Sequence, residues 1–198
     1  MKLTIFKKCI GVDGSKSASA AVSLFCMLVA PSITSAAVTD TARSSVTATA
    51  KQLGVPIEGK FKKLNAVVIF MPTQLAQSSA KIDIDVASYD MGAADYNKEV
   101  TGKDWFNAAQ FPKATFVSTS ITAAGADKYT VAGKLTLKGK VADVSFPFFV
   151  KTENGVNTFD GVLPIKRSVF NIGEGEWKDT SVVADEVLIK FHLVASGK

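Results

Sequence analysis

Cysteine and histidine are nearly absent from this chain of 198 residues. Its two cysteines, Cys9 and Cys26, lie within the first three dozen residues, and His192 is its single histidine. Beyond residue 36 this composition excludes thiol catalysis, disulfides and cysteine-ligated metals. It also excludes any metal site or proton shuttle that needs two histidines. We therefore expect no metal, no cofactor and no catalytic residue, hence a protein that is not an enzyme, with His192 on the surface.

The chain also lacks an apolar run long enough to cross a membrane as a helix, which takes about 20 residues. Residues 20–30 form an apolar run of only eleven. Basic residues precede this run and the small residues ITSAA follow Pro31, an order typical of a secretory signal peptide. We predict a signal peptide over residues 1–36, cleaved after Ala36 or Ala37, and a periplasmic protein. An uncleaved membrane anchor is the alternative.

The net positive charge is small outside this N-terminal segment. The whole chain has a net charge of +5, but residues 1–36 contain four lysines and one aspartate, which leaves +2 for the remainder. An excess this small does not suggest a nucleic-acid partner.

Alternation of apolar and polar residues dominates the rest of the chain and predicts strands. Tyr129, Val131, Leu135 and Leu137 alternate with Lys128, Thr130, Lys134 and Lys138, and Val187, Ile189, Phe191 and Leu193 alternate with Glu186, Lys190 and His192. Residues 45–50 and 81–86 show the same pattern, and residues 57–70, 114–122, 141–151 and 158–168 show it less regularly. We expect a flexible leader at residues 37–43 and a single domain at residues 44–196.

About eight antiparallel strands with one apolar face predict an all-β fold. Short turns at residues 125–127, 138–140 and 153–155 join the strands, and one short helical segment is expected around residues 93–107. Closure into an eight-stranded, lipocalin-like barrel would remove both exposed sheet edges and leave room for one small ligand. A two-sheet sandwich is the alternative.

Aromatic residues are plentiful, with 13 Phe, 3 Tyr and 2 Trp. They could simply fill a core, or they could line a ligand cavity. In the second case Lys103 and Lys113 are candidates for its mouth, although both could be ordinary surface lysines. The residues we predict to line the cavity are Trp105, Phe106, Phe116, Leu135, Phe146, Phe148, Ile189 and Phe191.

Several short motifs together resemble the YceI-like family of periplasmic polyisoprenoid-binding proteins, over residues 43–195. In chain order they are GVPIEGKF (54–61), ADYNKEV (94–100), WFN (105–107), FPKATF (111–116), GKLTLKG (133–139), IKR (165–167), FNIG (170–173) and DEV (185–187). The resemblance implies a lipocalin-like barrel that holds one isoprenoid lipid without a metal.

The first predicted strand departs from the family pattern, because the histidines that many members carry there are missing from residues 43–53. The segment QLGVP (52–56) is similar to the branch associated with inner-membrane di-haem b-type cytochromes. That similarity implies a quinone-like lipid as an alternative to a polyprenyl lipid, and a cytochrome as partner. A solid-cored protein that partners such a cytochrome and an enzyme acting on the bound lipid are the competing hypotheses.

Overall fold

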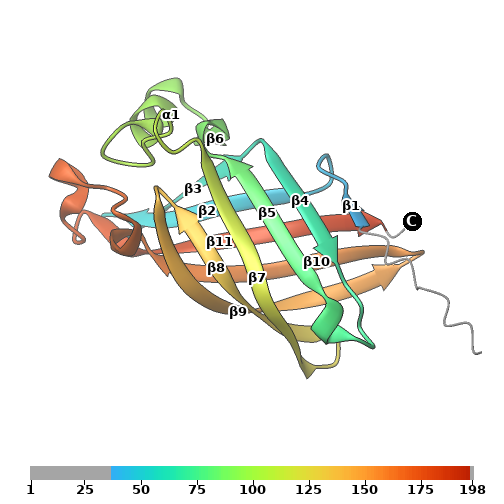
Figure 1. Cartoon of the computed structure of the whole chain (residues 1–198). Coiled ribbons are helices and arrows are strands. Elements are labelled where there is room, and N and C mark those ends of the chain that lie inside the picture. Colours follow the sequence, from blue (N-terminus) through green and yellow to red (C-terminus); the bar gives the residue numbers. More distant parts are fainter. Residues whose placement is uncertain (1–36, 197–198) are drawn as a thin grey trace, which may run out of the picture. The chain divides into compact units, whose positions relative to one another are not determined.

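The alternating segments form a single curled antiparallel sheet in the computed structural model, which describes residues 37–196 (Figure 1). The strands are β1 (Ala37–Thr39), β2 (Ser45–Gln52), β3 (Val55–Phe61), β4 (Leu64–Ile69), β5 (Ser79–Asp85), β6 (Tyr89–Asp90), β7 (Lys113–Gly125), β8 (Lys128–Leu137), β9 (Lys140–Glu153), β10 (Val156–Lys166) and β11 (Val183–Ser196). The helix α1 spans Ala94–Thr101, and the 3₁₀ helices are η1 (Leu75–Gln77), η2 (Val86–Ser88), η3 (Arg167–Phe170) and η4 (Gly175–Lys178). The predicted signal peptide lies outside the described residues.

The sheet closes on itself through β1, its short N-terminal strand. Its order is β1-β4-β5-β7-β8-β9-β10-β11-β2-β3-β6, and β1 also pairs with β11. Val38 thus lies opposite both Val67 and Ser196. Eight strands therefore follow one another around a ring, and β2, β3 and β6 extend it beyond β11. The predicted all-β, antiparallel fold is confirmed, but the ring includes β1, which was not predicted as a strand, and leaves out β2, which was. The single sheet rules out the sandwich.

This closure corrects the prediction of a flexible leader at residues 37–43. The first three of these residues are the strand that joins β4 to β11, and Thr39 Oγ1 donates a hydrogen bond of 2.6 Å to the carbonyl of Ala66. Asp40 then accepts hydrogen bonds from the backbone and side chain of Arg43. The leader prediction failed because three residues are too few to show alternation.

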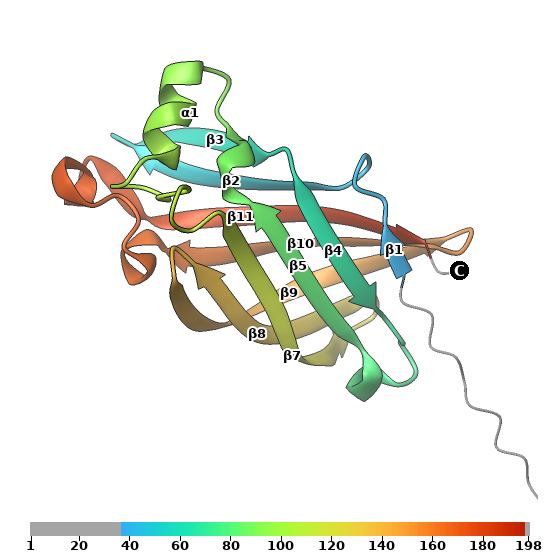
Figure 2. The same cartoon turned by 45° about the horizontal axis from the view of Figure 1, so that its top comes forward.

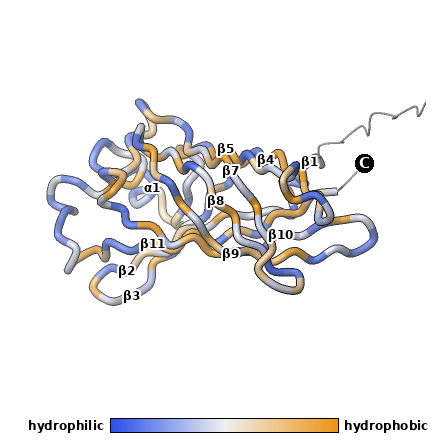
Figure 3. Tube along the Cα trace, turned by 60° about the horizontal axis from the view of Figure 1, so that its bottom comes forward, coloured by the Kyte–Doolittle hydropathy of each residue, from blue (hydrophilic) through white to orange (hydrophobic). Residues whose placement is uncertain are grey.

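Strand alternation sets which side chains face the interior. Hydrophobic and hydrophilic residues follow one another along the strands (Figure 3). The predicted inward residues of β8 and β11 are all buried or half-buried, and Lys128, Lys134, Glu186 and Lys190 are exposed. His192 is half-exposed on the outer face. Lys138 was predicted to be exposed, but only 7% of its side chain is accessible. The segment predicted as one strand at residues 57–70 divides into β3 and β4.

Helix α1 is shorter than the segment predicted around residues 93–107. It ends at Thr101, where Gly102 caps it, and turns follow. Asn97 fastens the helix to β6, because its amide donates to Asp90 at 2.7 Å and its oxygen accepts from the Met91 N–H. Hydrogen bonds from Lys62, Asn97 and Gly92 lower the pKa of Asp90 to about 2. In the part of the chain described, no helix is long and apolar enough to span a membrane.

Candidate ligand-binding site

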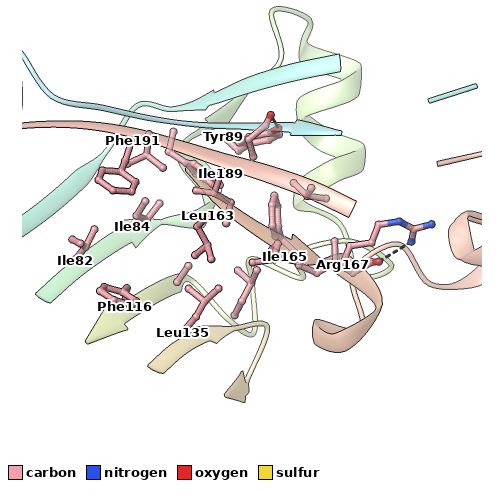
Figure 4. Close-up of a pocket in the computed structure, with 18 of the residues that line it drawn as sticks. Ile82, Ile84, Tyr89, Phe116, Leu135, Leu163, Ile165, Arg167, Ile189 and Phe191 are labelled. Atoms are coloured by element: carbon pink, nitrogen blue, oxygen red, sulfur yellow. Dashed lines mark hydrogen bonds between the residues drawn. The ribbon is translucent and has the colours of Figure 1, made fainter. Parts of the chain in front are cut away.

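A cavity of about 270 Å³ lies inside the curled sheet. Inward side chains of β5, β7, β8, β10 and β11 point toward this space from different sides (Figure 4). Small residues of β2, Ala48 and Ala50, complete part of its wall. The lining is almost wholly apolar, so the cavity suits hydrocarbon. A solid core is therefore excluded.

All eight residues predicted to line a cavity do line this one. The strands supply Phe116, Leu135, Phe146, Phe148, Ile189 and Phe191, and the loop after α1 supplies Trp105 and Phe106. Aromatic contacts connect them across strands, since the Phe146 ring lies 5.5 Å from Phe116 and 5.7 Å from Phe191. Their contact with a ligand remains a prediction.

Polar lining residues gather at the end of the cavity beside α1. Tyr96 and Glu99 come from the helix, Gln52 from the end of β2 and Trp177 from η4. Glu99 accepts a hydrogen bond of 3.1 Å from Trp177 Nε1, and the Trp177 ring lies 5.6 Å from that of Trp105. No local pattern in the sequence predicts this group, because its members come together only when distant loops fold back. The candidate lysines, Lys103 and Lys113, are exposed and are not part of the lining.

Arg167 lies at the same end of the cavity and is 2% exposed (Figure 4). Its guanidinium donates five hydrogen bonds of 2.7–3.2 Å, all to backbone carbonyls: those of Ile172, Gly173, Trp177, Val183 and Ala184. Burial lowers the pKa of Arg167, and the charge of Asp185 opposes this effect. Arginine nevertheless stays protonated at neutral pH. The residue therefore fastens the η3–η4 loop and has no free donor for a ligand.

Titratable groups are few in the lining of the cavity. Tyr89 donates to the Ala48 carbonyl at 3.1 Å, and burial, with a smaller contribution from Glu58, raises the pKa of Tyr89 to about 12. His192 contacts Asp160 at 2.7 Å on the outer face. Between residues 37 and 196, no three His, Cys, Asp or Glu residues are grouped to hold a metal ion.

Comparison with known proteins agrees with this fold. The crystal structure of Burkholderia cenocepacia BcnA is 59% identical, covers 80% of this chain and 99% of its own, and superposes with a TM-score of 0.78. A polyisoprenoid binding domain from Saccharophagus degradans, implicated in plant cell wall breakdown, has the same fold at 17% identity, covering 82% of this chain and 98% of its own, with a TM-score of 0.67.

Sequence relatives match over a shorter stretch. A UPF0312 protein of Photorhabdus laumondii is 36% identical over 81 residues, which is 41% of this chain and 42% of the relative. A Vibrio cholerae UPF0312 protein is 31% identical over 44% of this chain and 47% of its own length. The match therefore spans less than half of these curated relatives. The family model for the YceI-like domain matches residues 38–195, and the chain belongs to the YceI-like family.

Proposed function

We propose that this protein binds the tail of an isoprenoid lipid, of polyprenyl or quinone type, inside the cavity and carries or stores it in the periplasm without a chemical step. The observation that carries the proposal is a partly open apolar cavity whose polar residues gather at one end. The solved domain named as polyisoprenoid binding has the same fold and supports the choice of ligand.

Hydrophobic burial alone would retain such a ligand. Each Å² of apolar surface removed from water contributes about 25 cal/mol, and an isoprenoid tail is apolar along its whole length. The volume of about 270 Å³ suits one chain. A head group would then lie beside Tyr96, Glu99 and Gln52, where the lining becomes polar.

The absence of a chemical step is part of the proposal. An enzyme acting on the lipid would need an acid or base free to move a proton at the ligand. Glu99 is bound to the Trp177 indole, and every N–H of the Arg167 guanidinium is bound to a carbonyl. Both residues therefore support a binding site better than a catalytic one.

A second partner is proposed at the same end of the molecule. The tip of the β2–β3 hairpin carries Leu53 and Val55, which are 73% and 62% exposed, beside the polar end of the cavity. Large exposed apolar side chains that lie together are common at protein interfaces. The hairpin is where the inner-membrane b-type cytochrome implied by residues 52–56 would dock.

Native mass spectrometry of protein purified from the periplasm tests the main proposal. We expect a complex heavier than the chain by the mass of one isoprenoid lipid, and a chain that begins near Ala37 or Val38. Leu135→Trp places a larger ring in space that the lipid tail would occupy, so we expect the lipid affinity to fall roughly tenfold, equivalent to about 1.4 kcal/mol.

The matched control is Lys134→Trp, which adds the same ring on the outer face of the same strand. This variant should keep its lipid. Circular dichroism must show both variants folded. A folded Leu135→Trp variant that retains as much lipid as the wild type would contradict the proposed site, and a wild type without any lipid would contradict the function.

A further inference from the structure

Strands β9 and β10 are paired over only part of their length. Their ladder runs from the turn, where Val156 faces Glu153, to Gly161 opposite Phe148. Beyond that point residues 140–147 of β9 pair with β8 alone, and residues 162–166 of β10 pair with β11 alone. The two strands visibly diverge toward the α1 end (Figures 1 and 2). We call this unpaired stretch the β9–β10 seam.

A proline ends the ladder at the start of the seam. The hairpin turns on Asn154 and Gly155, both with positive φ. The residues that flank such a two-residue turn form a hydrogen-bonded pair, and hydrogen-bonded and non-hydrogen-bonded pairs then alternate along the ladder. By this alternation the first missing pair, Pro147 and Val162, would be hydrogen-bonded. Pro147 has no N–H to donate, so the ladder stops there.

A second proline lies on the opposite edge of the seam. Pro164 follows Val162 by two residues, so its nitrogen also faces β9 rather than β11. It therefore removes a donor from the seam without weakening the β10–β11 ladder, which continues to Lys166. Prolines at unpaired edges prevent strands from pairing. Both edges of the seam are thus unable to form a regular ladder.

Only one layer of side chains separates the cavity from the surface along the seam. Phe146, Leu163 and Ile165 face inward and line the cavity. Pro164 is exposed on the outer side, and so is Val162, at 41%. Separating the strands here would part these apolar contacts but would break no ladder hydrogen bond.

Contacts at both ends limit the seam. At the paired end the Phe191 ring covers Gly161, since a Cβ on that glycine would lie 2.4 Å from Phe191 Cζ. Phe191 also lines both the cavity and a groove on the outer surface. At the other end Lys138 Nζ, in the β8–β9 turn, lies 2.6 Å from the Asn171 carbonyl and 2.9 Å from Glu174 Oε2. That contact lowers the pKa of Glu174 and ties β9 to the loop that follows β10.

We propose that the β9–β10 seam is a side portal through which an apolar ligand passes between the cavity and the outside, with Lys138 as its latch. The polar end beside α1 then holds the head group, and the tail enters sideways. A lateral path suits a chain-like ligand, because the tail leaves its apolar surroundings progressively and the polar end need not be dehydrated first.

Cross-linking the seam tests this path. In exported protein with Cys9 and Cys26 replaced by serine, Ser145→Cys and Pro164→Cys place two exposed thiols on opposite edges. A short bis-methanethiosulfonate then joins them reversibly. The control pair, Lys134→Cys with Asp143→Cys, lies on β8 and β9, which are already paired. Release of the apolar dye N-phenyl-1-naphthylamine is followed by stopped-flow fluorescence.

Cross-linking the seam should slow dye release roughly tenfold, and reduction should restore it, whereas the control pair should change the rate less than about twofold. Equal release rates from seam cross-linked and reduced protein, with cross-linking shown complete by mass, would overturn the portal and leave the α1 end as the path. The dye needs only an apolar cavity, so this result is independent of whether the natural ligand is an isoprenoid.

The latch is tested without any cross-link. Lys138→Met removes the contacts of Lys138 Nζ with Asn171 and Glu174, and it should speed dye release roughly tenfold. The positive φ at this position is equally unfavourable for lysine and methionine, so the substitution adds no backbone strain. Lys140→Met, two residues away and exposed, is the control and should leave the rate unchanged. Unchanged release from Lys138→Met, or equally faster release from both variants, would contradict a latch at Lys138.

Discussion

Arg167 stabilises the loop at the polar end of the cavity through the fixed, planar arrangement of the N–H groups of its guanidinium. Its five N–H groups reach five carbonyls, a number that lysine could not match with three donors. These carbonyls belong to residues between η3 and the start of β11, so one side chain holds the whole connection together. The positive charge lies next to the cavity but is satisfied by backbone dipoles and is not offered to a ligand.

We expect Arg167→Met to lower the free energy of unfolding by about 2–4 kcal/mol, because it leaves buried carbonyls without donors. Urea denaturation followed by circular dichroism measures this change. Lys166→Met is the control, since Lys166 is exposed, and its effect should stay within about 0.5 kcal/mol. An equal loss in both variants would show that the Arg167 hydrogen bonds contribute little.

At the scale of residues, the sequence predicts correctly whether a side chain faces the interior where its own strand alone determines this. Leu135 and Phe146 were placed correctly because side chains on a strand alternate strictly. Lys138 was placed wrongly for the opposite reason. Alternation puts it on the polar side, but it occupies a tight turn, and the η3–η4 loop covers it. Its partners are more than 30 residues away in sequence, so no local pattern could reveal them.

At the scale of elements, the β2–β3 hairpin is the most exposed apolar feature at the α1 end. The docking proposed at this tip predicts that the wild type co-purifies with a detergent-solubilised inner-membrane b-type cytochrome, and that Leu53→Ser with Val55→Ser abolishes this co-purification and leaves the bound lipid unchanged. Val141→Ser, which removes another exposed side chain, from β9, is the control. Undiminished cytochrome binding by the double variant would contradict docking at the hairpin, and loss of lipid would show that the tip also supports the cavity.

Elements that need distant partners were the ones that the sequence could not predict. Strand β1 has three residues and no pattern of its own, yet it pairs with β4 and β11 and closes the ring. The seam was equally hidden. Pro147 and Pro164 both lie in segments predicted as strands. Only the register of β9 against β10 shows that both nitrogens face the seam, from its two opposite edges.

For the molecule as a whole, an apolar cavity inside a closed sheet means that ligand binding and folding stability are linked. A ligand that binds only the folded state stabilises it by about 2.7 kcal/mol at a concentration one hundred times its Kd. For a domain of this size that amounts to a rise in Tm of roughly 5–10 °C. We therefore expect delipidated protein to melt at a lower temperature than protein as purified, and a short-chain ubiquinone or farnesol to restore the higher Tm.

Cavity variants separate this effect from non-specific binding. Delipidated Leu135→Trp should show about half of the wild-type increase in Tm with either lipid, because a tenfold loss of affinity leaves about 1.4 of the 2.7 kcal/mol, whereas Lys134→Trp should respond like the wild type. Differential scanning calorimetry measures all three proteins under one set of conditions. An equal increase in Tm for Leu135→Trp and Lys134→Trp would place the lipid outside the cavity. No increase for the wild type, with lipid far above the concentration of protein, would contradict binding of these lipids to the folded state.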